Sequence, residues 1–74
     1  MARGSLAAAL AEFRRGSALA PENADLRIAL GEALLKSGMT EEAKKELQHA
    51  RKLSPGQTQA TDLLKTLESQ PRTY

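Results

Sequence analysis

Residues 29–47, ALGEALLKSGMTEEAKKEL, decide the fold because they read as a helix, a turn and a second helix. Gly38 suits the position just past a helix, where a left-handed backbone conformation favours glycine. Glu41 and Glu42 then fall in the first turn of the next helix, where carboxylates interact favourably with the helix dipole. The stretch therefore predicts a hairpin of two helices.

The first helix of this hairpin carries apolar residues on two faces. Leu30 and Leu34 lie on one side, and at roughly 100° per residue Ile28 and Leu35 point about 150° away from Leu30. A surface helix normally buries a single apolar stripe. Two explanations stay open: Ile28 packs on the helix that precedes it while Leu35 is an isolated exposed leucine, or the second face binds a partner.

An internal repeat of 34 residues runs through the chain. Pro21 and Pro55 keep this offset, and so do Gly4 and Gly38. Small and apolar positions follow the same offset, as do two glutamates. The pairs are Ala9 with Ala43, Glu12 with Glu46, Phe13 with Leu47, Leu19 with Leu53 and Leu30 with Leu64. A fixed period of this length indicates an array of helical repeats.

The pattern predicts four helices, at residues 5–20, 23–37, 40–54 and 55–70. Ser5, Asn23, Thr40 and Ser54 are the expected N-caps, with Pro55 at the first position of the last helix and Pro71 ending it. Apolar residues spaced three and four apart define the core stripes. These are Leu26, Leu30, Ala33 and Leu34; Ala43, Leu47, Ala50 and Leu53; and Ala60, Leu63, Leu64 and Leu67. Gly31 inside a helix indicates the close approach of another helix.

Composition excludes several functional classes. The chain has 74 residues, no cysteine and a single histidine, so we expect one small domain without disulfides, metal site or cofactor. The sole histidine, His49, lies within a predicted helix and is more typical of a surface residue than of a catalytic one. We therefore expect no enzymatic activity and no catalytic residue.

Charge and hydropathy exclude further partners. The net charge is +2, the basic residues are scattered, and aromatic residues are almost absent. A nucleic-acid surface would concentrate basic residues on one face, so no nucleic acid is expected. No run of about 18 apolar residues predicts a membrane span. The apolar run at residues 6–11 is short for a secretory signal peptide, so none is predicted.

The 34-residue hairpin resembles a tetratricopeptide repeat. The positions that carry the resemblance are Leu30, Gly31, Leu34, Ala43, Leu47, Ala50 and Pro55. The sequence departs from the family pattern at Gly16, which replaces an alanine, at Arg27, where an aromatic residue is common, and at Lys65, which replaces a glycine. The resemblance implies an all-α fold, a short right-handed solenoid of stacked helical hairpins.

The resemblance also divides the single domain at residues 1–74 into parts. Residues 5–20 would be the second helix, helix B, of a partial repeat. Residues 24–57 would form one complete repeat. Residues 58–70 would form a terminal capping helix, and 71–74 a frayed tail.

In this family the first helix of each repeat, helix A, lines a concave groove that binds a peptide or a helix of a partner protein. The resemblance therefore implies a non-catalytic protein–protein interaction module. The groove positions are Asp25, Ile28, Glu32, Leu35, Lys36, Asp62 and Thr66. Some members clamp a C-terminal carboxylate with lysines and asparagines. Asp25, Ile28, Ala29 and Glu32 match those positions and supply neither, so an apolar or basic partner segment is expected.

A second hypothesis is assembly. A solenoid repeat contacts only its neighbours, and about three repeats are usually needed for stability. The first helix lacks a helix A and the last lacks a helix B, which would leave Leu6, Leu10 and Phe13 uncovered for self-association as a homo-oligomer. Alternatively, the chain is a fragment of a longer tetratricopeptide scaffold.

Overall fold

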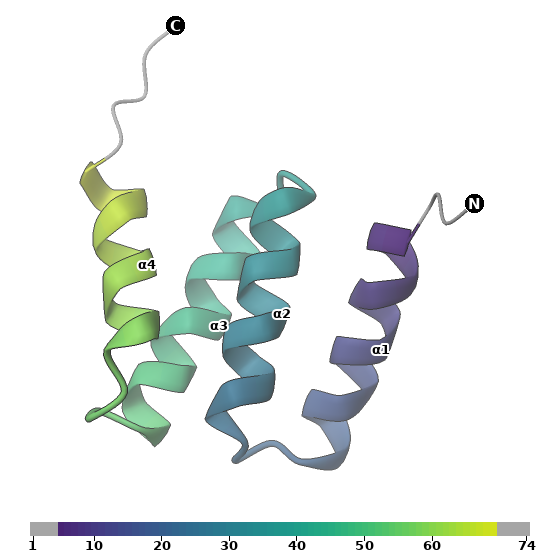
Figure 1. Ribbon diagram of the computed structural model, residues 1–74, viewed down its shortest axis with the longest axis horizontal. Helices are drawn as coiled ribbons and strands as arrows, with labels where there is room; N and C mark the ends of the chain where they lie inside the picture. The colour runs from purple at the N-terminus through teal and green to yellow at the C-terminus, as the bar shows by residue number, and fades with distance from the viewer. Residues whose placement is uncertain (1–4, 70–74) are drawn as a thin grey trace, which may run out of the picture.

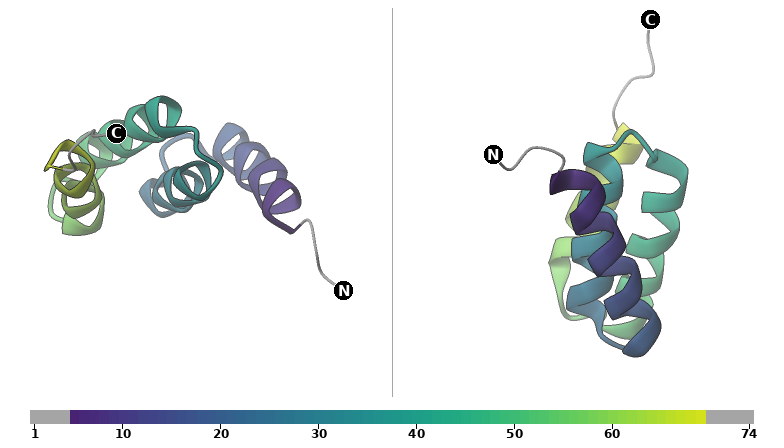
Figure 2. Two further views of the ribbon diagram at one scale, coloured as in Figure 1. Left: turned by 90° about the horizontal axis from the view of Figure 1, so that it is seen from above. Right: turned by 90° about the vertical axis from the view of Figure 1, so that its right-hand side faces the viewer.

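The computed structural model describes residues 5–69, which form four helices and no strand. They are α1 (Ser5–Leu19), α2 (Ala24–Lys36), α3 (Thr40–Leu53) and α4 (Thr58–Ser69). Each helix packs against the next, with the most extensive contact between α2 and α3 (Figure 1). Seen from above, α2 and α4 lie on the same side of α3 (Figure 2). The all-α fold is confirmed, and none of the helices in this range is long and apolar enough to cross a membrane.

The turns around α2 follow from two residues that the sequence singles out. The Asn23 side chain accepts a hydrogen bond from the Leu26 amide at 3.1 Å, which confirms the predicted N-cap. Gly38 has a φ of 80°, and its amide donates to the Leu35 carbonyl at 3.1 Å. The Met39 amide reaches back to the Leu34 carbonyl at 2.9 Å. These two bonds form a Schellman motif, which requires a residue tolerant of positive φ.

The predicted N-caps of the last two helices are wrong. Met39, not Thr40, is the N-cap of α3, and no side chain caps that helix. Residues 54–57 form a turn in which the Gln57 amide donates to the Ser54 carbonyl at 3.0 Å, so α4 begins at Thr58. The same turn closes residues 20–23 one repeat earlier, where proline also occupies the second position. Proline is favoured there because its fixed φ suits a turn.

The predicted N-cap of the first helix and the predicted end of the last helix lie at or beyond the limits of the described residues. Ser5 is the first residue of α1, so the position that would cap this helix falls outside them. Pro71 and the predicted tail at 71–74 also lie outside.

The two apolar faces of α2 are explained by its position between neighbours. On one face, Leu30 and Leu34 are buried with Ala43 of α3, and half-buried residues of α1 pack on this cluster. On the other face, Ile28 is 3% exposed in a cluster that α3 and α4 complete. The members of this second cluster are Ile28, Leu47, Ala50, Ala60 and Leu64. Ile28 therefore packs on α3 and α4 rather than on α1, and its assignment to an exposed groove surface is corrected.

Eight of the twelve predicted core positions are buried, three are half-buried and one is exposed. Leu53, the last residue of α3, is 37% exposed because the chain leaves the helix there for the turn at residues 54–57. Leu26, Leu63 and Leu67 are half-buried. The others are buried: Leu30, Ala33, Leu34, Ala43, Leu47, Ala50, Ala60 and Leu64.

Gly31 of α2 packs closely against Leu47 of α3. A Cβ atom built on Gly31 would lie 2.8 Å from both Cγ and Cδ2 of Leu47, which is too close for two carbon atoms. Leu47 is fully buried, so its side chain has little room to move away. The expectation that glycine here permits a close helix approach is confirmed.

Gly31→Ala is predicted to lower stability, although alanine is favoured over glycine within a helix by about 1 kcal/mol. Overpacking of a core costs roughly 1–3 kcal/mol, which outweighs this gain. In a Leu47→Ala background the steric conflict is absent, so the same change should stabilise the protein by about 1 kcal/mol. Urea unfolding of the four proteins measures both effects.

Gly56→Ala is the matched control for this experiment. No atom lies within 4 Å of a Cβ built on Gly56, so this change should be neutral or slightly stabilising. If Gly31→Ala stabilises the protein in both backgrounds, the close packing of Gly31 against Leu47 is contradicted.

Candidate partner-binding site

The predicted groove residues of α2 include two carboxylates that contact α4 or the turn before it. Asp25 is exposed, and its Oδ1 accepts a hydrogen bond of 2.7 Å from Nε2 of Gln57. Glu32 is half-buried, and its Oε2 accepts a bond of 3.3 Å from Nε2 of Gln59. Both carboxylates therefore lie where α2 meets the start of α4.

The remaining predicted groove residues differ in their exposure. Leu35 is half-buried and packs on both core clusters, whereas Lys36, Asp62 and Thr66 are exposed. The Thr66 hydroxyl donates to the Asp62 carbonyl at 3.0 Å, so it is partly used within α4. We call this surface the α2–α4 face. It consists of Asp25, Glu32, Leu35, Lys36, Asp62 and Thr66.

A second surface is an apolar groove between α1 and α2, with a volume of about 210 Å³. We call it the α1–α2 groove. Its wall on α1 contains Leu6, which is 39% exposed, and Phe13, which is half-buried. Its full lining is Leu6, Ala9, Phe13, Ala29, Glu32, Ala33 and Lys36. The sequence predicts Leu6 and Phe13 at an uncovered end, whereas the alanines of α2 were not recognised as part of this surface.

Leu10, the third residue predicted for self-association, lies in a different environment from Leu6. It is half-buried and packs on the cluster of Leu30, Leu34 and Ala43, as Phe13 also does. Leu10 is not among the residues that line the α1–α2 groove. Its main contribution is to attach α1 to the core.

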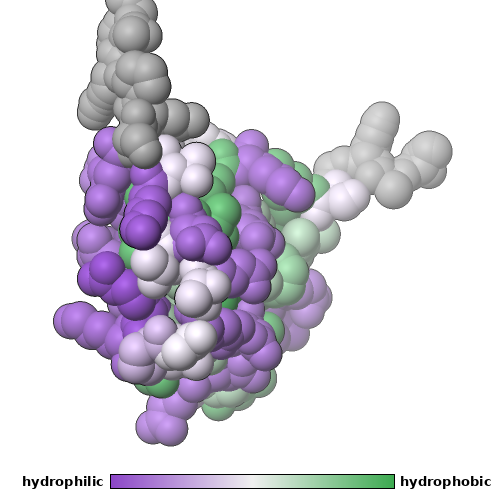
Figure 3. Space-filling model, turned by 60° about the vertical axis from the view of Figure 1, so that its left-hand side comes forward, coloured by the Kyte–Doolittle hydropathy of each residue, from purple (hydrophilic) through white to green (hydrophobic). Residues whose placement is uncertain are grey.

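The surface of α4 that Figure 3 brings forward is predominantly hydrophilic. The described exposed residues of this helix are all polar: Thr58, Gln59, Asp62, Lys65, Thr66 and Glu68. The two ends of the array therefore differ. The end formed by α1 presents an apolar groove, whereas the exposed residues of α4 in the described range are polar.

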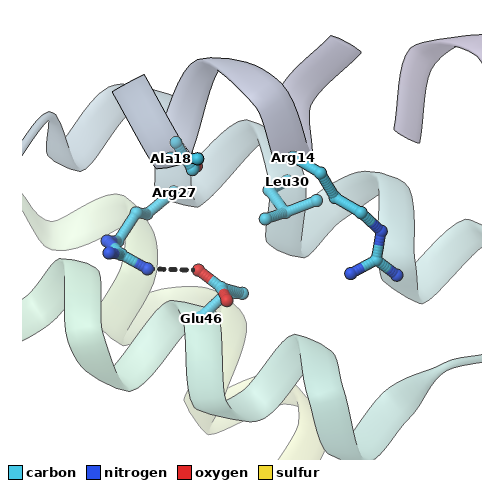
Figure 4. A pocket seen from close by; sticks show the side chains of 6 residues that line it. Arg14, Ala18, Arg27, Leu30 and Glu46 are labelled. Carbon is cyan, nitrogen blue, oxygen red and sulfur yellow. Dashed lines mark hydrogen bonds and ion pairs between the residues drawn. The ribbon is translucent and has the colours of Figure 1, made fainter. Parts of the chain in front are cut away.

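Sequence reasoning missed a partly buried ion pair at the junction of α1, α2 and α3. Arg27 Nη1 lies 2.8 Å from Glu46 Oε1, and the two side chains are only 14% and 20% exposed (Figure 4). Arg27 Nε also donates to the Pro21 carbonyl at 2.9 Å. Arg27 thus replaces the expected aromatic residue by bonding to α3 and to the preceding turn. The sequence feature that could have indicated this ion pair is the glutamate that recurs at the 34-residue offset, at positions 12 and 46.

A second ion pair connects α1 to α3 at the surface. Arg14 Nη1 donates to Glu42 Oε2, and the side chains are 45% and 38% exposed. The hydrogen bond from Arg14 lowers the pKa of Glu42, and the same bond raises the pKa of Arg14. Arg14 also lines the shallow depression drawn in Figure 4. The buried Ser17 belongs to the same lining. The Ser17 hydroxyl has no hydrogen-bond partner within residues 5–69.

The outer surface of α3 carries a shallow basic depression lined by Lys45, Gln48, His49 and Lys52. His49 is exposed there. Within the part of the chain that the structure describes, no group of three or more potential ligand side chains could hold a metal ion.

Comparison with known proteins assigns the family. Residues 1–67 match the family model for the tetratricopeptide repeat. The chain belongs to the tetratricopeptide repeat family. No curated protein and no solved structure gives a significant match. Tetratricopeptide repeats in general mediate protein interactions, so surfaces that contact other proteins are the relevant sites in this fold.

The two ion pairs of this tetratricopeptide repeat protein are predicted to differ in strength. Arg27 and Glu46 are largely shielded from water, so a double-mutant cycle with Arg27→Met and Glu46→Gln should give a coupling energy of about 1–2 kcal/mol. The exposed Arg14 and Glu42 should give a clearly smaller coupling with the equivalent changes. Urea unfolding measures both cycles. Equal couplings would contradict the difference in burial.

The Arg14–Glu42 pair also predicts a pH dependence. Because folding lowers the pKa of Glu42, its contribution to stability is complete above the unfolded pKa of about 4.3 and is lost as pH falls through the lower folded value. The effect of Glu42→Gln on unfolding should therefore be constant between about pH 6 and 8 and vanish near about pH 2. Glu41→Gln, whose side chain is 87% exposed, is the control. A loss that persists at low pH would contradict this origin.

Proposed function

We propose that this chain is a non-catalytic protein–protein interaction module that binds a segment of a partner protein on the α2–α4 face. The single observation that carries this proposal is the tetratricopeptide repeat match over residues 1–67, since members of the family act through protein contacts. The arrangement of α2 and α4 on the same side of α3 is consistent with it (Figure 2).

The charge of the α2–α4 face supports a particular partner chemistry. Asp25, Glu32 and Asp62 contribute three carboxylates, against the single ammonium group of Lys36. Such a face repels a C-terminal carboxylate and favours a basic segment. Leu35 adds an apolar contact, although it is partly covered. The partner segment that fits best is therefore basic, with apolar side chains between the charges.

Catalysis is not part of the proposal. A catalytic site requires a nucleophile, a base or a bound metal held in a pocket. His49 is exposed in a shallow depression among lysines, and the pKa shifts found at Arg14 and Glu42 arise from their mutual hydrogen bond. These features are typical of surface residues.

Self-association is the second candidate. The observation that favours it is the uncovered α1–α2 groove, where Leu6 and Phe13 remain partly exposed. The polar surface of α4 gives no such support at the other end. Assembly would therefore involve the α1 end.

The partner chemistry of the α2–α4 face predicts a preference between two synthetic peptides. Both have the same leucine pattern, and one carries lysines where the other carries glutamates. Fluorescence anisotropy should show at least about tenfold tighter binding of the lysine peptide. Asp62→Lys should abolish this preference, because it reverses the charge at the exposed centre of α4.

Glu41→Lys is the matched control, since it makes the same charge change at an exposed position of α3. It should preserve the preference for the lysine peptide. If Asp62→Lys and Glu41→Lys have equal effects, binding follows net charge and the α2–α4 face is not the site.

A further inference from the structure

The α1–α2 groove is the counterpart, one repeat earlier, of the site that α2 itself occupies against α3 and α4. With the 34-residue offset, Phe13 corresponds to Leu47, and Ala9 to Ala43. On the other wall, Ala29 corresponds to Leu63, and Ala33 to Leu67. In the later site, Gly31 of α2 rests on Leu47, and Ile28 is buried between α3 and α4. The structure thus shows what kind of element fills such a groove.

We infer that the α1–α2 groove binds an amphipathic basic helix of a partner protein, lying parallel to α2 and antiparallel to α1. This surface shares Glu32 and Lys36 with the α2–α4 face but extends to α1, and the inference does not rest on the binding proposed for that face. Positions on the bound helix are given below by the α2 residue to which they correspond.

The shape of the groove specifies the apolar side of this helix. Phe13 corresponds to Leu47, the residue that packs closely against Gly31. The bound helix therefore needs glycine at the position of Gly31. Ala29 and Ala33 replace two leucines and leave an open volume of about 210 Å³. Large apolar side chains at the positions of Leu34 and Leu35 would fill this space.

A carboxylate beside the groove specifies a charge. Glu12 corresponds to Glu46, which binds the guanidinium of Arg27 at 2.8 Å. Glu12 lies three residues after Ala9 and therefore on the same side of α1 as Ala9. It is exposed and has no ion pair within residues 5–69. An arginine or lysine at the position of Arg27, four residues before the glycine, would complete this interaction.

A second polar contact has its donor and acceptor exchanged between the two sites. Gln59 donates a hydrogen bond to Glu32 of α2 at 3.3 Å. One repeat earlier the residue is Asp25, whose Oδ1 already accepts a bond from Gln57 at 2.7 Å and which, when ionised, can only accept a further bond. The bound helix therefore needs an amide or a cation at the position of Glu32. Both polar contacts thus favour a helix that is basic along this edge.

A second copy of this chain does not offer a suitable helix A. Aligned by the repeat, α4 places Asp62 at the position of Ile28, Lys65 at that of Gly31 and Glu68 at that of Leu34. Two of these replace residues that are at most 3% exposed in α2. Burying these charges without partners would be strongly unfavourable. The groove is therefore not filled by α4 of a second copy.

The test uses a fluorescent peptide derived from α2, with the sequence of residues 22–37. Leu26→Gln and Leu30→Gln remove the apolar face that α2 turns toward α1, and Glu32→Gln supplies the donor for Asp25. Binding to the complete 74-residue chain is measured by fluorescence anisotropy. We expect saturable binding, and Gly31→Leu in the peptide should weaken it at least about tenfold through the clash with Phe13.

A charge exchange locates the peptide at Glu12. Glu12→Arg in the protein should weaken binding at least about tenfold, and Arg27→Glu in the peptide should restore it. Glu41→Arg is the matched protein control, because this exposed glutamate lies on α3 away from the groove; it should change neither peptide's affinity.

Three results would overturn the inference. The first is the absence of saturable binding. The second is equal effects of Glu12→Arg and Glu41→Arg, without restoration by the reversed peptide. The third is a dimer of the chain in light scattering that Leu6→Glu dissociates while the peptide fails to bind, which would assign the groove to a second copy. The charge exchange at Glu12 and the dissociation by Leu6→Glu both act on α1, so a failure of the binding proposed for the α2–α4 face would leave these two readouts unchanged.

Discussion

The contact between the Gly31 backbone and the fully buried Leu47 sets the distance between α2 and α3, and the rest of the structure depends on it. With these helices close together, α2 can bury Leu30 and Leu34 on one side and Ile28 on the other. Two apolar faces on one short helix are thus accounted for by packing. The central helix supplies four of the nine buried hydrophobic residues of the described chain: Ile28, Leu30, Ala33 and Leu34.

The sequence predicted the features that arise from local chemistry or from the repeat. Asn23 caps α2, Gly38 takes positive φ, and the glycine at position 31 permits close packing, each for the reason expected. The start of α4 was predicted too early, because the serine and proline at 54–55 fit both a capped helix and a turn. The 34-residue repeat favours the turn, because residues 20–23 form the same turn one repeat earlier.

The candidate surfaces were harder to predict from the sequence, because the exposure of a side chain depends on which helices pack beside it. Ile28 and Leu35 share a face of α2, yet α3 and α4 bury the first and only half-cover the second. Arg27 departs from the family's aromatic preference, and only its contact with Glu46 shows why an arginine is tolerated there. The polar outer surface of α4 and the apolar groove beside α1 give the array two different ends. A partner helix is therefore expected beside α1 rather than beyond α4.

The central claim is that α2 is held between neighbours on both sides, and native-state hydrogen exchange followed by NMR tests it most directly. Amides from Ile28 to Leu34 should be the most protected in the chain and exchange only through global unfolding, whereas those of α1 should open at lower free energy, since α1 is packed on one side. Protection in α2 no greater than in α1 would contradict the account.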